Sequence, residues 1–146
     1  MRYVVYLDTC CFNRPYDDQQ HPLIRIETEA KLLIQYEVMK QNIDIVWSFI
    51  LHYENSDNPF ADRKRQIALW EARATRSVPY SHEVQKQAQR ITALGIKTKD
   101  ALHIACAIAA EAKYFITTDK KLLNKRVDGI VITDPMDFVR RYFGEN

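Results

Sequence analysis

Four acidic residues are the side chains of this sequence best placed to do chemistry. Asp8 directly follows an apolar, β-branched stretch, Asp119 ends a second such stretch, and Glu54 lies about one helical segment after a third. Asp100 opens a run that is apolar nearly all round, which is typical of a buried helix. Because ligands bind beyond the carboxyl ends of the strands in parallel α/β sheets, we expect the four carboxylates to meet at one edge.

Carboxylates brought together in this way repel one another. Either some of their pKa values rise strongly, or cations neutralise the cluster. A divalent cation that prefers oxygen ligands, Mg²⁺ or Mn²⁺, suits such a site and keeps several of its own water molecules. The cation lowers the pKa of a bound water, which can then attack phosphorus, and it stabilises the negative charge that develops.

Each acid also has a purely structural interpretation. Asp8 and Asp119 are typical of residues that end a strand or cap the next turn. Asp100 follows the possible helix cap Thr98 and would interact favourably with the helix dipole, and Glu54 would be an ordinary solvated helix residue. Taken singly these interpretations are preferable, whereas the four acids together, expected at one edge of the sheet, favour a metal site.

Short apolar stretches that alternate with helical patterns provide the elements that position these acids. The predicted strands are 2–7, the stretch with Ile43, Ile45 and Trp47, 114–119 and 129–134. The predicted helices are 22–40, one with Phe49, Ile50 and Tyr53, a long charged one opening at Pro59, 81–94, 97–113, 119–125, and 135–143 capped by Asp134. This alternation predicts an α/β fold on a small parallel sheet.

Apolar residues in the predicted helix 22–40 are spaced to form one face. That face consists of Leu23, Ile26, Ala30, Leu33 and Ile34. An amphipathic helix turns its apolar face toward the core, so the spacing predicts that these side chains pack inside the protein.

Length and composition restrict the class of protein. The 146 residues fit a single domain, 1–146, and 47% hydrophobic with 27% charged residues is typical of a folded chain, not of a disordered one. No apolar run approaches the roughly 18 residues of a membrane span, and the apolar run after Met1 is too short for a signal sequence. We therefore expect a cytoplasmic protein without membrane attachment.

Net charge and cysteine spacing exclude further classes. A formal net charge of +2 is too small for a dedicated nucleic-acid-binding domain, so any contact with nucleic acid must depend on local groups of charges. Cys10, Cys11 and Cys106 have no paired spacing. We expect them to be reduced, small, buried side chains.

Four segments of the chain resemble the motifs of PIN-domain nucleases. They are LDTCCFNRP around Asp8, HYENSDNP around Glu54, KDALHIACAI around Asp100 and FITTDKKLL around Asp119. Their order and separations resemble the family over essentially the whole chain. The resemblance implies a three-layer α/β/α sandwich with a small central parallel sheet, and it implies that the four acids are the catalytic residues and the ligands of Mg²⁺ or Mn²⁺.

The same resemblance implies an activity and partners. PIN-domain proteins are metal-dependent ribonucleases, and prokaryotic members of this length are commonly the toxin of a toxin–antitoxin pair of the VapC type. By resemblance we expect an endoribonuclease that hydrolyses RNA phosphodiester bonds, forms a homodimer and is held by a cognate antitoxin protein. Cys10 and Cys11 stand where many members carry Ser, Val or Leu, and the stretch FNRPYDDQ is longer and more polar than in many members.

Further candidates adjoin the acids in the sequence. The hydroxyls of Thr9 and Thr118 are expected to orient carboxylates or bound water, although ordinary turn hydroxyls occupy such positions equally often. Asn13 and Arg14 lie just past the first acid and Lys120 directly follows the last. They are candidates for binding the phosphates of the RNA, against the alternative that they are simply solvated surface residues.

Side chains outside the acidic motifs have less specific interpretations. His103 is expected to be packed and hydrogen-bonded and not a metal ligand, because Mg²⁺ and Mn²⁺ prefer oxygen. Tyr16, Phe60, Trp70 and Tyr80 lie outside the predicted strands and are candidates for anchoring an antitoxin helix or a second copy of the chain. The alternative for Trp70 is that it packs against its own helix.

Two other functions compete with the nuclease. One is a PIN-like module that binds RNA or a protein but does not cut, a state that the loss of one or more of the acids would mark. The other is a phosphoacceptor receiver domain, which would need an acidic pair near the start of the chain and a lysine in a late loop. The sequence has a single acid, Asp8, at the first of these positions.

Overall fold

The computed structural model describes residues 2–145, and its strands form one sheet. The strands are β1 (Tyr3–Leu7), β2 (Ile43–Ser48), β3 (Arg76–Val78), β4 (Tyr114–Ile116) and β5 (Val131–Thr133). The α-helices are α1 (Thr9–Asn13), α2 (Pro22–Met39), α3 (Phe49–Ser56), α4 (Ala61–Ala68), α5 (His82–Thr92), α6 (Thr98–Ala109), α7 (Lys120–Leu123) and α8 (Pro135–Glu145). The 3₁₀ segments η1 (Arg14–Tyr16) and η2 (Leu69–Arg73) follow α1 and α4. No helix within residues 2–145 has both the length and the apolar composition needed to cross a membrane.

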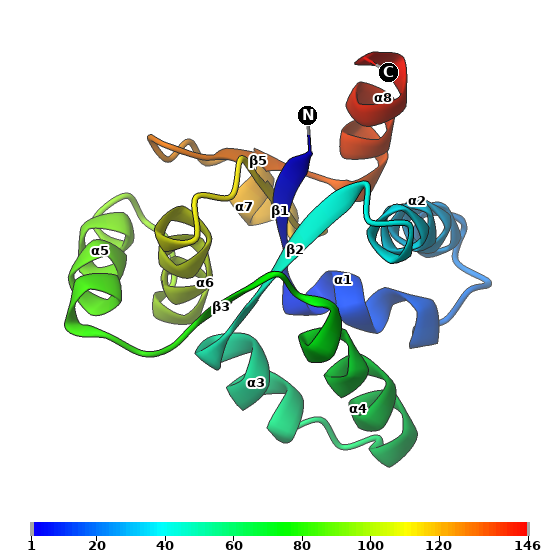
Figure 1. Cartoon of the computed structure of the whole chain (residues 1–146), viewed down its shortest axis with the longest axis horizontal. Coiled ribbons are helices and arrows are strands. Elements are labelled where there is room, and N and C mark those ends of the chain that lie inside the picture. Colours follow the sequence, from blue (N-terminus) through cyan, green and yellow to red (C-terminus); the bar gives the residue numbers. More distant parts are fainter. Residues whose placement is uncertain (1, 146) are drawn as a thin grey trace.

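The sheet has the strand order β3-β2-β1-β4-β5, and every pair of neighbouring strands is parallel. Figure 1 shows helices on both faces, with α5 and α6 on one side and α2 and α8 on the other. The predicted three-layer α/β/α sandwich with a central parallel sheet is therefore confirmed. Because all strands run the same way, they end at one edge of the sheet, here called the carboxyl edge, where α1, α3 and α7 begin.

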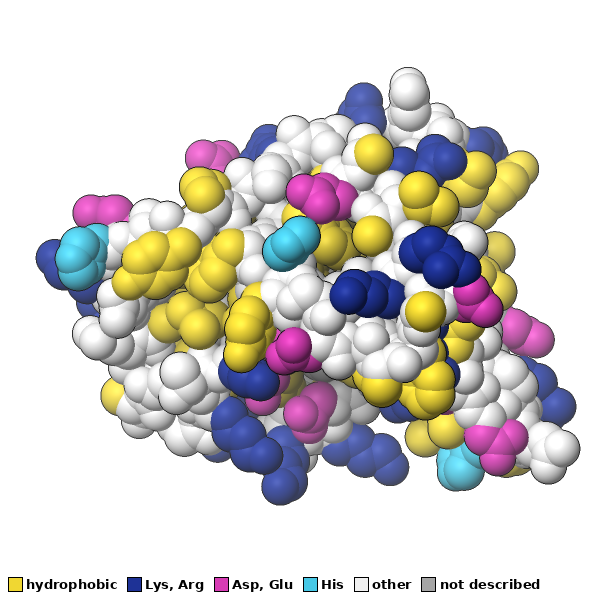
Figure 2. Space-filling model, turned by 90° about the horizontal axis from the view of Figure 1, so that it is seen from below, with side chains coloured by type: hydrophobic (Ala, Val, Ile, Leu, Met, Phe, Trp, Pro, Cys, Tyr) yellow, Lys and Arg dark blue, Asp and Glu magenta, His cyan; other side chains and the backbone are white. Residues whose placement is uncertain are grey.

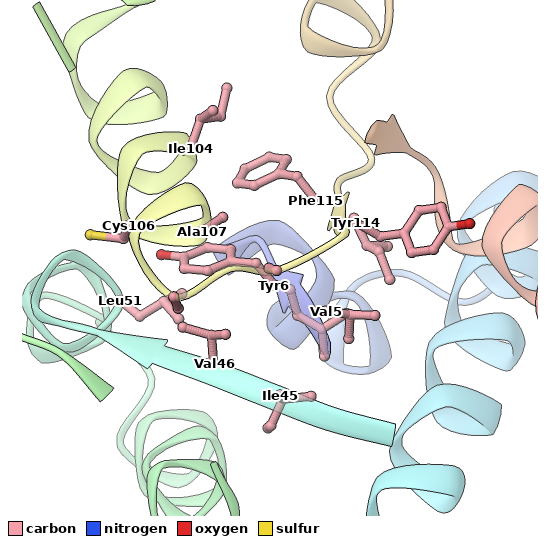
Figure 3. Close-up of a cluster of buried hydrophobic side chains, with 14 of the residues drawn as sticks. Val5, Tyr6, Ile45, Val46, Leu51, Ile104, Cys106, Ala107, Tyr114 and Phe115 are labelled. Carbon is pink, nitrogen blue, oxygen red and sulfur yellow. The ribbon is translucent and has the colours of Figure 1, made fainter. Parts of the chain in front are cut away.

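β1 lies in the middle of the sheet because its side chains are apolar on both faces. Val5, Tyr6 and Leu7 have no exposed surface, and successive side chains of a strand point to opposite faces. In Figure 3, Tyr6 points toward α6 together with Phe115 of β4, whereas Val5 points away from that helix. The Tyr6 and Phe115 rings are stacked with their centroids 5.4 Å apart. The Tyr6 hydroxyl therefore lies against α6, the helix that contains Asp100.

Side chains at the strand ends cap the helices that follow. Asp8 caps α1 by accepting a hydrogen bond from the next backbone N–H at 2.8 Å, and Asp119 caps α7 by accepting from the N–H two residues on at 2.9 Å. Ser48 caps α3 by accepting from the N–H three residues on at 3.2 Å. The predicted cap Asp134 of α8 is confirmed by its bond from the N–H three residues on at 2.7 Å. Asp8 and Asp119 therefore have a structural role, which uses one oxygen of each carboxylate.

Three segments differ from the expected elements. The stretch after β1, predicted as a loop, forms α1 and η1. The helix predicted from Pro59 is interrupted, because α4 ends at Ala68 and the chain continues as the 3₁₀ segment η2. β3 was not predicted; of its residues only Val78 is buried, so this edge strand lacks the period-two apolar pattern that marks a strand.

The buried face of α2 agrees only in part with the predicted one, since Ala30 and Ile34 are buried as predicted. Ile26 and Leu33 are 49% and 45% exposed, so their predicted burial is wrong. The buried side chains of α2 are Glu27, Thr28, Ala30, Lys31, Ile34, Gln35, Glu37 and Val38. Polar partners on the inside explain the difference, as Glu27 accepts a hydrogen bond from the Arg14 guanidinium at 3.0 Å.

Lys31 on this inner face is buried without a counter-ion. Lys31 is 3% exposed, and its amine lies 5.4 Å from the centroid of the Phe12 ring. No carboxylate within residues 2–145 forms an ion pair with it. Burial disfavours the charged form and lowers the pKa of Lys31 to about 7.

We predict that Lys31→Met stabilises the protein below about pH 7. The unfolded chain keeps a proton on Lys31 up to the ordinary value of 10.5, whereas the folded chain loses it above about 7, so wild-type stability rises as the pH increases between these values. Removing the charge should raise the free energy of unfolding by at least ~1 kcal/mol near pH 6, and the gain should shrink toward pH 10. Urea unfolding at several pH values measures this, with the exposed Lys40→Met as control. A Lys31→Met protein less stable than wild type near pH 6 would contradict the assignment.

Candidate active site

Asp8 is the most buried of the four acids, and both of its carboxylate oxygens are held. The residue is 6% exposed. Oδ1 accepts the hydrogen bond from the Thr9 backbone N–H at 2.8 Å, and Oδ2 accepts one from the Thr117 hydroxyl at 2.8 Å. The Asp8 N–H donates to the carbonyl of Ile116 at 2.9 Å, continuing the pairing of β1 with β4. Sheet pairing thus places Asp8 beside the residues that follow β4.

Glu54 reaches the same place from α3. Its Oε1 accepts a hydrogen bond from the Thr9 hydroxyl at 2.6 Å and is also hydrogen-bonded to Nε2 of His103. Burial acts to raise the pKa of Glu54, but the hydrogen bond with His103 and the charge of that ring outweigh burial, so the pKa is lowered. Glu54 is therefore an ionised carboxylate that side chains of two other helices hold in place.

His103 on α6 is packed and hydrogen-bonded, as predicted. It is 1% exposed, its Nδ1 lies 2.6 Å from the Tyr6 hydroxyl, and that hydroxyl lies 2.6 Å from the Ser48 hydroxyl. Burial disfavours the charged ring, but the hydrogen bond with Glu54 and the negative charges of Asp8 and Glu54 outweigh it and raise the pKa of His103. A protonated imidazole donates from both nitrogens, which matches a position between a carboxylate and a phenol oxygen.

Asp100 and Asp119 complete the acidic group. Asp100 lies in the first turn of α6, where burial and the negative charges of the other three acids raise its pKa; the charge of His103 offsets this only in part. The backbone N–H of Asp119 donates to the Thr117 hydroxyl oxygen at 3.1 Å. The acids come from four different elements, yet each of the others contributes to the electrostatic field at Asp100.

The acids are neighbours without forming a preformed ligand set. Within residues 2–145, no three His, Cys, Asp or Glu side chains lie close enough together to hold one metal ion. Glu54 is drawn to His103, and the remaining carboxylates repel one another. Figure 2, which looks onto the carboxyl edge, shows acidic side chains gathered in the lower middle of this face with Lys and Arg side chains around them.

Thr117 is the functional candidate that the sequence interpretation missed. Its hydroxyl donates to Asp8 and accepts from the backbone of Asp119, whereas the hydroxyl of Thr118 accepts a hydrogen bond from the Arg14 guanidinium at 3.0 Å. Thr118 was chosen because it adjoins Asp119 in the sequence. Side chains two residues apart in extended chain point the same way, and that spacing relates Asp119 to Thr117.

Only one of the predicted phosphate-binding residues has an uncommitted side chain. Arg14 forms ion pairs with Asp17 and Glu27, each at 3.0 Å, so its charge is neutralised inside the protein. The Asn13 amide donates to the carbonyl four residues earlier at 3.1 Å. Lys120 is exposed and has no ion-pair partner within the described part of the chain. Arg14 and Asn13 hold the α1–η1 segment together, and Lys120 faces solvent beside Asp119.

Cys10 contacts the buried acid, which was not expected. Its sulfur lies 3.6 Å from Oδ2 of Asp8 and 3.5 Å from the Thr117 hydroxyl. All three cysteines are free, as predicted, and Cys11 and Cys106 are buried, but Cys10 is only partly buried. The expectation that Cys10 is buried is therefore met only in part, because its side chain packs against the core and also lines the acidic site.

We predict that Thr117→Val lowers the free energy of unfolding by about 1–3 kcal/mol, because it leaves an oxygen of the buried Asp8 without its donor. Thr117→Ser keeps the hydroxyl and should lose clearly less. Urea unfolding at neutral pH compares the two variants. A Thr117→Val protein as stable as the wild type, or more stable than Thr117→Ser, would show that the hydroxyl does not support Asp8.

The sequence matches a known protein family, and the fold resembles two solved structures. Residues 5–128 match the family model of the PIN domain, and no curated protein is a significant match. The chain is similar to one in the structure of VapBC2 from Rickettsia felis bound to a DNA fragment from its promoter, with 18% identity and a TM-score of 0.61 over 90% of this chain and 98% of that one. It is also similar to one in VapBC-1 from nontypeable Haemophilus influenzae, with 19% identity and a TM-score of 0.55 over 91% and 98%. These two likenesses concern the fold, whereas the family match spans most of the sequence: this chain belongs to the PIN-domain family.

Proposed function

We propose that this protein is a metal-dependent endoribonuclease that hydrolyses the phosphodiester bonds of RNA. The observation that carries the proposal is a group of carboxylates, those of Asp8, Asp100 and Asp119, that pair with no Lys or Arg side chain within residues 2–145. His103 offsets only part of this negative charge, and the remainder suits a bound cation. Membership of the PIN-domain family supports the same function.

The chemistry of the donors fits Mg²⁺ or Mn²⁺. All of them are carboxylate oxygens, the ligands that these ions prefer. Asp8, Asp100 and Asp119 would bind the ion directly. Glu54 would bind directly or through a water, since its Oε1 already takes part in two hydrogen bonds. When bound, such an ion lowers the pKa of a water molecule and stabilises negative charge on the phosphate.

Other side chains of the site position the acids and the substrate. The Thr117 hydroxyl orients Asp8, and the Thr9 hydroxyl and His103 hold Glu54. The acids repel an approaching phosphate, so cations beside them are needed to bind the RNA backbone. Lys120, exposed directly after Asp119, supplies one such charge.

A PIN-like module that binds RNA or a protein without cutting is the alternative. Such a module would not need four acids that act on one another at the carboxyl edge, as these do. Membership of the PIN-domain family also argues against the phosphoacceptor receiver domain. The choice between nuclease and binding module depends on whether the acids support cleavage.

We predict that Asp100→Asn abolishes cleavage of RNA in Mn²⁺ or Mg²⁺ while the protein stays folded. The change removes a metal ligand and relieves the repulsion that raises the pKa of Asp100, so stability in EDTA should be unchanged or higher. Gel assays on a labelled single-stranded RNA and thermal melting measure the two effects, with the exposed Asp128→Asn as control. Undiminished metal-dependent cleavage by Asp100→Asn would overturn the assignment, and a wild type that binds RNA but never cuts it would favour the binding module.

We infer that the protein acts with two protein partners, an antitoxin and a second copy of itself. The likeness to chains of two VapBC structures supports an antitoxin. Of the aromatic residues considered as anchors, Tyr16, Phe60 and Tyr80 are exposed, but Trp70 packs partly against the core and is unsuited to this role. The exposed three remain candidates for contact with the antitoxin.

The outer face of α2 supports the second copy. Its exposed apolar residues are Ile26, Leu32, Leu33, Tyr36 and Met39. Arg25 and Glu29, of opposite charge, are exposed on the same side of the helix. Two α2 helices packed antiparallel about a two-fold axis would cover the apolar residues and bring each arginine toward the glutamate of the other copy.

Leu33→Asp is therefore expected to convert a dimer into a monomer, because a charge in the middle of an apolar interface cannot be solvated. Light scattering after size-exclusion chromatography measures the mass. Leu69→Asp, at a position 61% exposed on η2, is the matched control and should leave the dimer intact. A wild type that is monomeric at all accessible concentrations would contradict the interface.

A further inference from the structure

Tyr53 and Lys99 form a pair at the border of the acidic site that none of the roles above uses. Tyr53 lies on α3 one residue before Glu54, and Lys99 lies on α6 one residue before Asp100. The Lys99 amine is 5.7 Å from the centroid of the Tyr53 ring. The pair therefore connects the two helices that supply these acids.

The side chains of this pair are available to a ligand. Tyr53 is 52% exposed, and its hydroxyl has no hydrogen-bond partner among the described residues. Lys99 is exposed and forms no ion pair within residues 2–145. Its charge is one of those that lower the pKa of Glu54, so the amine lies within electrostatic reach of the carboxylates.

Another Lys–Tyr pair shows what is particular about this one. The Lys40 amine lies 5.1 Å from the centroid of the Tyr36 ring, and Tyr36 is 58% exposed. Those residues belong to the end of α2, next to the start of β2 and thus at the edge opposite the acids, and Lys40 also lies 3.7 Å from Glu37. A lysine over a tyrosine ring is therefore not itself a sign of a site. The position of Tyr53 and Lys99 beside the acids is what distinguishes them.

We propose that Tyr53 and Lys99 form a nucleotide-binding subsite for single-stranded RNA, in which the ring stacks on a nucleobase next to the scissile phosphate and the amine binds an adjoining phosphate. The proposal rests on the proposed ribonuclease function, because the acids locate the phosphate that is cut. Aromatic side chains bind unpaired bases by stacking, whatever the base, and lysines bind the backbone between them.

RNA fits this position better than a protein partner does. The carboxylates of Asp8, Asp100 and Asp119 repel a polyanion, so RNA needs a cation beside them in order to bind. Lys99 supplies such a cation, because it forms no ion pair within residues 2–145. An exposed ring one residue from a metal-binding acid is within reach of the nucleoside attached to the bound phosphate. A base inside a duplex has no free face for the ring, so the subsite selects unpaired nucleotides.

Binding is best measured in Asp100→Asn protein, which is predicted above to stay folded and not to cut. The probe is a single-stranded oligoribonucleotide carrying 2-aminopurine at each position in turn, whose fluorescence falls when the base stacks. Adding Tyr53→Ala should weaken binding about tenfold and remove the quenching at one position, whereas Tyr53→Phe, which keeps the ring, should restore both. Adding Lys99→Gln should weaken binding and reduce the slope of log K against log salt by about 0.7. Lys40→Gln, at the edge opposite the acids, is the matched control for Lys99 and should change nothing.

Cleavage assays on variants that keep Asp100 separate an effect on RNA binding from an effect on the positioning of the scissile phosphate. Tyr53→Ala should raise KM with a smaller effect on kcat, and the preference for single strands over duplex should weaken. Circular dichroism and melting establish that each variant is folded; Tyr53→Gln, which keeps bulk without a ring, replaces Tyr53→Ala if that variant does not fold. Unchanged binding and KM in the variant without the ring would overturn the subsite, as would a loss confined to the binding of a protein partner.

The two proposals can fail separately. A wild type that cuts no RNA in either metal, while the oligonucleotide still binds in a way that depends on Tyr53, would overturn the ribonuclease and support the subsite as a site for RNA. A wild type that cuts RNA, together with a Tyr53→Ala variant that cuts it equally well, would support the ribonuclease and overturn the subsite.

Discussion

The buried hydrogen bonds of His103 are the interactions on which the rest of this site depends. A row of polar groups runs from Ser48 through Tyr6 to His103, and from there to Glu54 and Thr9. The row joins three parts of the chain that are distant in sequence, namely β1 with α1, β2 with α3, and α6. A buried polar group without a partner is costly, so these groups are stable only together. The row therefore determines how α3 and α6 meet at the carboxyl edge.

This row also divides the acids into two kinds. Glu54 is hydrogen-bonded to His103, whose pKa is raised by that contact, and Asp8 lies 3.8 Å from the same ring nitrogen, whereas Asp100 and Asp119 form no ion pair within residues 2–145. Asp8 and Asp119 additionally cap α1 and α7, so a helix start fixes one oxygen of each carboxylate. The structural and chemical interpretations of these residues are thus compatible: the helix cap orients a carboxylate whose remaining capacity is available to a ligand.

Two surfaces follow from the way the helices pack. The inner side of α2 contains polar groups such as Glu27 and Lys31, and this leaves Leu33 and Tyr36 on the outside, on a face suited to a second copy. At the carboxyl edge, Lys and Arg side chains lie around acids that would repel RNA by themselves (Figure 2), and the exposed ring of Tyr53 lies on α3 one residue before Glu54. Partner contact and substrate contact would therefore use different sides of the molecule.

The sequence by itself determined that Asp8 and Asp119 follow strands and that Asp119 and Asp134 are placed to cap helices. Apolar periodicity and helix capping are local properties of a segment, so they can be recognised without the fold. The alternation of apolar stretches with helical patterns predicted an α/β fold on a parallel sheet, and the resemblance to PIN-domain proteins implied its three layers. The short edge strand β3, with a single buried residue, has no local pattern to find. Only the tertiary structure decided that α2 turns Leu33 outward and that Thr117, not Thr118, holds Asp8. These outcomes depend on which partners meet across the fold, and no periodicity within one segment specifies a contact with another.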